Sequence, residues 1–292
     1  MENTRTKTTR NSLILLLTAA IWGMAFVSQS KGMDYMHPFT FNGVRSLIGA
    51  ASILVYILIS RKIAGDKAAP LDWKLNVKAG LLCGIFLTIA STLQQFGIKY
   101  TSVGKAGFIT TLYIIFVPMF GIFLKKKVAP VVWAAAVMAA VGMYLLCMTE
   151  SLRLGAGDIM VFLCAIAFAI QIMTVDHYAA RIDGAVVSCI QFTVCGVVCC
   201  IGALIWGQPT FGQLQEGLGA LLYAGVLSCG VGYTLQIVGQ KGLNPTVAAL
   251  IMSLESVIAT ISGWIAYKIG FLTTDQTLTA RQIAGCVIVF AA

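Results

Sequence analysis

The chain has 292 residues, of which 59% are hydrophobic and only 11% are charged, and its mean hydropathy is +0.89. Soluble domains carry about 25% charged residues, so this composition excludes an ordinary soluble protein. In a soluble protein the net charge of +9 would suggest a nucleic-acid partner, but here the charges follow a membrane topology, and we expect no nucleic acid.

Apolar stretches long enough to cross a bilayer, which takes roughly 20 residues, recur along the whole chain. Seven are uncharged: 11–30, 79–98, 106–124, 128–149, 159–175, 184–215 and 217–240. Three more complete the set: 38–60, interrupted by Arg45; 245–267, interrupted by Glu255; and 282–292, which ends with the chain. Strands of a β-barrel would alternate polar and apolar residues, and these runs are continuous. We therefore predict an all-α membrane protein with ten transmembrane helices, the last one truncated.

The basic residues are distributed unevenly between the two sides of this predicted topology. With a cytoplasmic N-terminus, 13 of the 20 Lys and Arg residues are cytoplasmic, six lie on the opposite side, and Arg45 lies within a span. This bias, which is weaker in the second half, follows the positive-inside rule. We predict a multi-pass protein of the cell membrane, the inner membrane in a bacterium, with its N-terminus in the cytoplasm.

The first 30 residues also fit a secretory signal, because a basic segment precedes an apolar run. The run continues through Trp22 and Phe26 to Ser30, which is long enough to span, so we interpret it as an uncleaved first helix. All nine cysteines fall inside predicted spans and are interpreted as small packing residues. Since neither His37 nor His177 lies in a span, we expect no metal site and no cofactor.

A short string occurs twice, as TLQQFGIK at 92–99 and TLQIVGQK at 234–241, with five of the eight positions identical. The same offset of 142 residues pairs Ala106 with Ala248, Ile109 with Ile251, Leu112 with Leu254, Tyr113 with Glu255 and Gly121 with Gly263. We predict two repeats, 1–149 and 154–292, with five spans each. Because five is odd, the second repeat enters the membrane from the opposite side, so the repeats are inverted. Packing alone would explain Gly97 and Gly239, but not the matched glutamines Gln94 and Gln236.

Several strings in this order resemble EamA-type members of the drug/metabolite transporter superfamily. They are IWGMAFVSQ, FNGVR, TLQQFGIKYTSVGKAGFITTLYIIFVP and LNPTVAALIMSLESV, followed by the pair Gly263 and Trp264. The resemblance covers nearly the whole chain. It implies ten helices in two inverted five-helix halves, substrates that are small metabolites such as amino acids or toxic solutes, and usually export.

Two features depart from that family pattern. YKIG at 267–270 stands where many relatives have a Gly-Glu pair, and the last apolar run stops at Ala292. These departures leave open the contacts that a homodimer would use.

Polar residues within spans are costly and usually face the interior of the bundle, where they mark candidate sites. The predicted substrate-binding residues are Trp22, Phe26, Gln94, Gln95, Tyr113, Gln171, Gln236 and Glu255, and Glu255 and Arg45 are candidates for coupling or gating. Each has a structural alternative. Arg45 would bond carbonyl groups or extend to an interface, the glutamines would tie helices together, and Trp22 and Phe26 would pack.

The function predicted from these residues is secondary transport of a small amphipathic metabolite, an amino acid or related solute, by alternating access. Glu255 lies near mid-membrane and would bind and release a proton, or else serve as a structural carboxyl group. An uncoupled facilitator or channel-like permease, and less readily a scaffold or receptor, are alternatives. A hydrolase is disfavoured because no span holds a histidine, and an ATP-driven pump because SVGKAG at 102–107 lacks the phosphate-loop pattern.

Overall fold

The computed structural model describes residues 4–65, 70–124, 130–147, 155–273 and 275–291, and these residues form helices and connecting loops without any strand. Eight helical segments are long and apolar enough to span a membrane: Lys7–Gly32, Pro38–Ala64, Trp73–Ile98, Val103–Phe123, Ala156–Tyr178, Gly184–Gly207, Leu218–Gln240 and Pro245–Lys268. Two apolar helical stretches are shorter, Trp133–Gly142 and Ala280–Val289. The prediction of an all-helical, multi-pass membrane protein is therefore confirmed.

The first part of the chain forms α1 (Thr4–Gly32), α2 (Pro38–Ala64), α3 (Trp73–Ile98), α4 (Val103–Thr111), α5 (Tyr113–Phe123) and α6 (Pro130–Cys147). The second part begins with α7 (Ala156–Tyr178) and α8 (Gly184–Gly202), which continues as the π-helix η2 (Ala203–Gly207). There follow α9 (Phe211–Glu216), α10 (Leu218–Leu222), the π-helix η3 (Tyr223–Gly232), α11 (Tyr233–Gln240), α12 (Pro245–Met252), α13 (Glu255–Lys268) and α14 (Ala280–Ala291).

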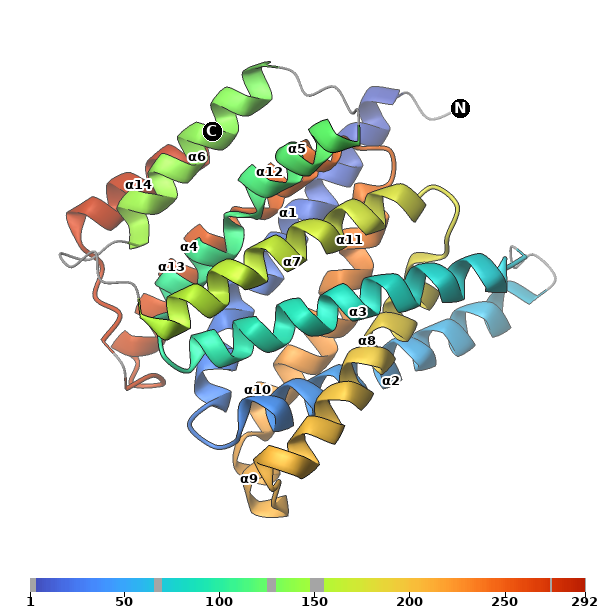
Figure 1. The fold of residues 1–292 in the computed structure, drawn as a ribbon, viewed down its shortest axis with the longest axis horizontal. Helices are drawn as coiled ribbons and strands as arrows, with labels where there is room; N and C mark the ends of the chain where they lie inside the picture. The colour runs from blue at the N-terminus through green and yellow to red at the C-terminus, as the bar shows by residue number, and fades with distance from the viewer. Residues whose placement is uncertain (1–3, 66–69, 125–129, 148–154, 274, 292) are drawn as a thin grey trace.

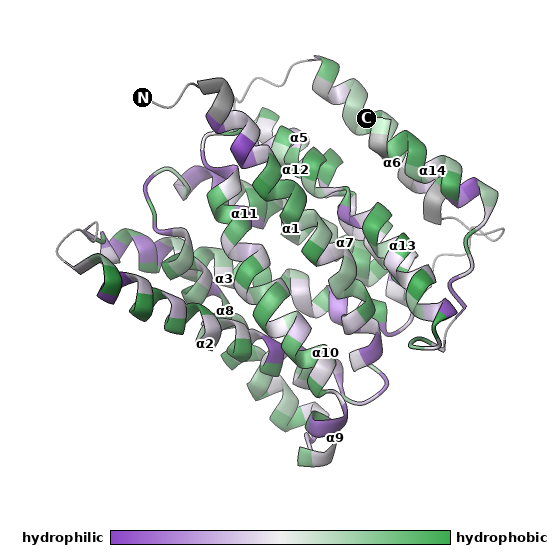
Figure 2. Ribbon diagram, turned by 180° about the vertical axis from the view of Figure 1, so that it is seen from behind, coloured by the Kyte–Doolittle hydropathy of each residue, from purple (hydrophilic) through white to green (hydrophobic). Residues whose placement is uncertain are grey.

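The helices pack as a bundle in which segments far apart in sequence lie side by side (Figure 1). α6 and α14 form a pair at one edge, and α2 and α8 pack together at the opposite edge. Between these pairs, α3 packs on α7, and α1 packs on α13 and α11. Hydrophobic residues run along the outer helices (Figure 2), where side chains such as Ile59, Leu204 and Val287 are exposed. This apolar outer surface suits a lipid environment.

The predicted span 184–215 is too long. The helical segment that begins at Gly184 ends at Gly207, and α9 is a separate short helix. Gln208 has a left-handed backbone conformation (φ 42°), and the following Pro209 has no amide hydrogen to donate. The stretch without charged residues continued to 215, but the backbone chemistry at Gln208 and Pro209 ended the helix.

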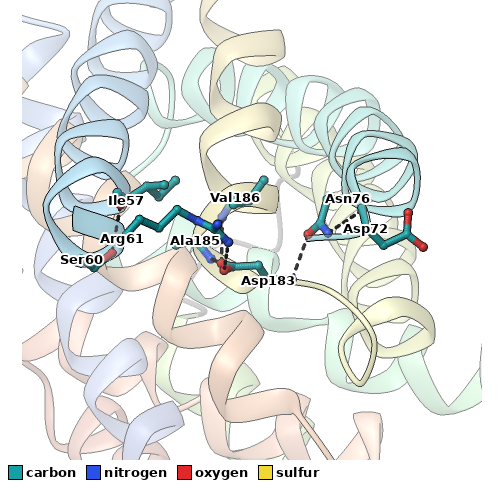
Figure 3. Close-up of polar contacts among 8 residues, drawn as sticks. All are labelled: Ile57, Ser60, Arg61, Asp72, Asn76, Asp183, Ala185 and Val186. Atoms are coloured by element: carbon teal, nitrogen blue, oxygen red, sulfur yellow. Dashed lines mark hydrogen bonds and ion pairs between the residues drawn. The ribbon is translucent and has the colours of Figure 1, made fainter. Parts of the chain in front are cut away.

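A polar cluster fixes one end of the bundle, where α2, α3 and the start of α8 meet (Figure 3). The carboxylate of Asp183 accepts hydrogen bonds from the backbone N–H groups of Ala185 and Val186 and lies 4.0 Å from Arg61. Asn76 accepts a bond from the Asp183 backbone N–H at 2.9 Å. These bonds cap α8 and tie it to α2 and α3.

Two glycines allow pairs of helices to approach closely. A Cβ atom at Gly97 would collide with Val161 and lie 2.8 Å from the carbonyl oxygen of Gly157, both on α7. At Gly239 it would lie 2.7 Å from the Leu15 side chain on α1. The interpretation of both glycines as sites of close helix packing is confirmed.

We predict that Gly97→Ala lowers the free energy of unfolding by about 1–3 kcal/mol, since the backbone of α7 must shift to admit the methyl group. Gly212→Ala on α9 is the matched control, because an added Cβ there has nothing within 4 Å. Denaturant unfolding of both variants in detergent measures the difference. Equal stability of the two variants would contradict the close-packing account.

Candidate functional site

Four residues on one face of α1 line a cavity at the centre of the bundle. Trp22, Ala25, Phe26 and Gln29 are spaced by three or four residues, so their side chains project in the same direction. The Trp22 indole nitrogen donates to the carbonyl oxygen of Ser228 at 3.4 Å. The centroids of the Trp22 and Tyr233 rings are 4.5 Å apart. Two of these four, Trp22 and Phe26, are predicted site residues.

The Ser228 carbonyl lies in the π-helix η3, which leads into α11. Its oxygen also accepts the backbone N–H of Tyr233, five residues later, in the pattern of a π-helix. After the wider turn, Ser228, Tyr233 and Gln236 lie in the cavity wall next to α1. A π-helix is a frequent feature of functional sites.

Two membrane-spanning segments are interrupted beside the cavity. The segment 103–123 breaks at Leu112 between α4 and α5, and the segment 245–268 breaks at 253–254 between α12 and α13. At each break a hydroxyl group donates to a backbone carbonyl three residues earlier: Thr111 to Phe108 at 2.8 Å, and Ser253 to Leu250 at 2.7 Å. Such local bonds compete with the helical ladder. The two breaks come at equivalent positions of the sequence repeat.

Tyr113 and Glu255, the first residues after these breaks, meet in the cavity. The Tyr113 hydroxyl donates to Glu255 Oε1 at 3.0 Å, and both side chains are buried. Glu255 begins α13, so its carboxylate lies at the positive end of that helix dipole. The repeat offset of 142 pairs these two residues in sequence, and the structure joins their side chains by a hydrogen bond.

Arg45 lies in the cavity wall and is only 5% exposed. Its Nε donates to Asn42 Oδ1 at 3.0 Å, and its guanidinium carbon lies 5.5 Å from the centre of the Phe41 ring. Within the described parts of the chain, no carboxylate lies within 4.0 Å of Arg45. The structure therefore does not pair Arg45 with Glu255, and it does not extend Arg45 to an interface.

The α2 helix that carries Arg45 begins at a histidine cap. His37 Nδ1 accepts the backbone N–H of Phe39 at 3.3 Å. Burial and, second, the positive charge of Lys99 lower the pKa of His37 below its ordinary value. The ring is thus neutral at neutral pH, which leaves its nitrogen free to accept this bond.

The glutamines both line the cavity and tie helices together. Gln94 donates to Thr110 Oγ1 at 3.2 Å, Gln236 donates to Gln171 Oε1 at 3.2 Å, and Gln171 donates to Gln191 Oε1 at 3.4 Å. Gln94, Gln171 and Gln236 are part of the cavity wall. Gln95 is placed elsewhere: it is buried between α1 and α3, where it donates to the carbonyl oxygen of Gln29 at 3.2 Å.

The cavity is small in this conformation. Its lining comes from α1, α2, α3, α4 and α5 on one side and from α7, η3, α11 and α13 on the other. About 30 Å³ is open to the centres of water-sized molecules, which is room for roughly two waters. A metabolite can occupy this site only after the helices move apart.

Contacts join the first and second parts of the chain at both ends of the bundle. At one end, Lys105 Nζ lies 2.7 Å from Asp158 Oδ2, and Thr101 donates to Asp158 Oδ1 at 2.9 Å. At the other end, Asn11 donates to the carbonyl oxygen of Lys241 at 2.8 Å. No group of three or more His, Cys, Asp or Glu side chains in the described part of the chain is arranged to hold a metal.

Comparison with known proteins assigns this architecture to a family. The sequence pattern described as the EamA-like transporter family matches residues 10–148 and, a second time, residues 155–292. The chain belongs to the EamA-like transporter family. The resemblance noted from the sequence is therefore confirmed, and the protein is a multi-pass membrane transporter.

Relatives in this family carry only general names. The chain is 27% identical over 287 residues to the uncharacterized transporter YwfM of Bacillus subtilis, an alignment that covers 96% of this chain and 94% of that protein. It is 22% identical over 292 residues to an uncharacterized transporter of Clostridium kluyveri, covering 95% and 89%. An uncharacterized transporter of Archaeoglobus fulgidus is 30% identical over 171 residues, which is 56% of this chain and only 48% of that protein. One crystal structure shares the fold, with a TM-score of 0.73, 16% identity and coverage of 97% and 94%.

Sequence reasoning missed several residues of the EamA-like site. Gln29, Thr110, Phe168, Ser228 and Tyr233 also line the cavity. Helical spacing carries a usable signal for three of them: Gln29 lies three residues after Phe26, Phe168 three before Gln171, and Tyr233 three before Gln236. Asn42, which holds Arg45, lies three residues before it and could have been found in the same way.

Proposed function

We propose that this EamA-like transporter is a secondary transporter that moves a small metabolite by alternating access between two inverted five-helix halves, 1–149 and 154–292. The observation that carries the proposal is the central cavity, which is lined by both halves and closed by contacts between them. Counting the paired helices α6 and α14 as the fifth and tenth spans gives five helices in each half.

The glycine contacts support a two-fold relation between the halves. Gly97 packs on Val161, and Gly239 packs on Leu15. Adding 142, the offset of the repeated octet, to 97 gives 239. Subtracting 146 from 161 gives 15, and at this second offset FNGVR at 41–45 aligns with VSCIQ at 187–191. Each half therefore supplies the glycine at one contact and the branched side chain at the other. Repeats of this kind give two near-equivalent conformations, one open to each side of the membrane.

The lining of the cavity favours a small amphipathic solute, an amino acid or related compound. It combines aromatic residues, among them Trp22, Phe26 and Tyr113, with four glutamines and one acid, Glu255. Ligand sites typically combine apolar walls with a few polar groups that fix orientation. We propose export as the direction, with the N-terminus in the cytoplasm and the bacterial inner membrane as the location. An uncoupled facilitator remains the second candidate, since it would use the same cavity.

The test of alternating access uses matched positions at the two ends of the bundle. Ile98 and Gln240 are separated by the repeat offset of 142 and are both buried. We predict that Lys105→Ala, which breaks the ion pair at one end, raises thiol labelling of Ile98→Cys and lowers that of Gln240→Cys. Labelling with a membrane-impermeant maleimide, after replacement of the native cysteines, measures both rates.

The exposed Tyr100 supplies the control, because Tyr100→Cys should label equally with and without Lys105. If labelling of Ile98→Cys and Gln240→Cys rises together, a channel open at both ends replaces alternating access. If neither rate changes, the ion pair does not hold that end closed.

A second prediction concerns Glu255 as the coupling residue. Its carboxyl group faces Tyr113, Tyr233 and Arg45, and its surroundings change from closed to hydrated as the cavity opens. An ionised carboxylate in the bilayer centre costs about 2.5–3.5 kcal/mol on insertion scales, so such a change of solvent can drive proton binding and release. Glu255→Gln, which keeps the shape but cannot titrate, should abolish stimulation of transport by an imposed pH gradient.

The measurement is flux of a radiolabelled amino-acid mixture in proteoliposomes with and without the gradient. Glu216→Gln, an exposed position on α9, is the matched control and should keep the stimulation. Unchanged rate and pH dependence in folded Glu255→Gln would exclude coupling at this residue and favour the facilitator.

A further inference from the structure

We infer that Arg45 binds a single carboxylate group of the transported solute, and that the solute also carries hydrogen-bond donors. This inference rests on the proposed transport function and assigns the chemistry that the cavity recognises. Three observations carry it: the way in which Arg45 is held, the unmatched charges in the cavity, and the unpartnered acceptors around it.

The Arg45 side chain is held so that its two terminal nitrogens stay available. Asn42 binds the Nε group at 3.0 Å, and Asn42 is itself fixed by bonds to Ser91 Oγ at 3.1 Å and Cys199 Sγ at 3.3 Å. Nη1 and Nη2 make no hydrogen bond to any described residue, although the side chain is 95% buried. A planar guanidinium with both terminal nitrogens free matches the two oxygens of a carboxylate.

Among the residues that the structure describes, no carboxylate lies within 4.0 Å of Arg45 to balance its charge. Buried charges are normally paired, because a charge removed from water is costly without a partner. Among the described residues of the cavity wall, Arg45 is the one cation and Glu255 the one acid, and they do not form an ion pair within 4.0 Å. A bound carboxylate would supply the missing partner of Arg45.

The same wall excludes solutes with a second negative charge. Glu255 lines the cavity together with Arg45, so a dicarboxylate or a phosphate would place like charges in one low-dielectric site. A single guanidinium also offers too little positive charge to hold a dianion there. The solute that fits carries one carboxylate.

The remaining polar atoms favour a solute with hydrogen-bond donors. Gln29 Oε1 and Gln236 Oε1 are buried acceptors without a partner, and both residues line the cavity. Glu255 Oε1 accepts from Tyr113, and its second oxygen makes no bond to a described residue. Ammonium, amide or hydroxyl hydrogens on the solute would satisfy these atoms, since buried polar atoms in proteins normally have partners.

The experiment compares acids with carboxamides on the same skeleton. Purified wild-type protein is titrated with the twenty L-amino acids and their carboxamides, and binding is followed by thermal stabilisation and by the fluorescence of Trp22 in the cavity wall. We expect each acid that binds to do so at least about tenfold more tightly than its carboxamide, because removing one partner of a buried charge pair commonly costs more than a factor of ten. Succinate and inorganic phosphate should not bind.

Equal binding of acid and carboxamide, binding of phosphate or succinate instead, or no binding by any carboxylate in the set overturns the inference. The variants Arg45→Lys, which keeps the charge but loses the planar fork, and Arg45→Gln should reduce the preference for the acid. Arg61→Gln, at the far end of α2 where the side chain is 36% exposed, is the matched control and should keep it. The wild-type comparison keeps the test decisive where a variant fails to fold.

Flux measurements separate this inference from the function on which it rests. Transport of a carboxamide at the rate of its acid would leave the proposed transport standing and remove the role of Arg45. Selective binding of acids without any flux in proteoliposomes would keep the carboxylate site and remove the proposed transport.

Discussion

Polar groups inside a bilayer must find their partners within the protein, and this constraint governs the centre of the bundle. Lipid cannot solvate Arg45, Glu255 or glutamines such as Gln94, Gln171 and Gln236, and these side chains gather around one internal cavity. The same constraint places the helix breaks. Backbone groups released at Leu112 and at 253–254 are tolerated because the breaks lie inside the protein beside the cavity and not against lipid.

The close packing around the cavity makes its opening a discrete event. At Gly97 and Gly239 the glycine backbone packs directly against Val161 and Leu15 of the neighbouring helix, so small displacements there would create voids or collisions. Packed interfaces of this kind favour two distinct arrangements over gradual deformation. The proposed alternating access requires that the Lys105–Asp158 pair at one end and the Asn11–Lys241 contact at the other break and re-form in turn.

The length of the hydrophobic runs and the repeated octet predicted much of the fold, because spanning helices and duplicated segments can be recognised directly in the sequence. The repeat also brought Tyr113 opposite Glu255. Hydrophobicity could not show the breaks at Leu112 and 253–254, where hydroxyl groups bond the backbone, or the end of the sixth long segment at Gly207.

Sequence reasoning also could not decide which of two adjacent residues of the same type faces the cavity. Gln94 and Gln95 follow each other, yet a helix turns them by about 100° relative to one another, so only Gln94 reaches the cavity. Which of the two faces inward depends on the rotation of α3 against α7 and α1. That rotation depends on packing at Gly97, and it cannot be predicted from a single sequence.

The most direct test of a transporter whose halves must separate is a reversible cross-link between them. Lys105→Cys with Asp158→Cys, in a background without native cysteines, joins the halves through a cleavable bifunctional thiol reagent, and Lys31→Cys with Asp34→Cys makes the same link within one half. Solute flux in proteoliposomes should stop when the first pair is linked, recover when the link is cleaved, and continue throughout with the second pair. Undiminished flux across the linked Lys105–Asp158 pair would contradict the account.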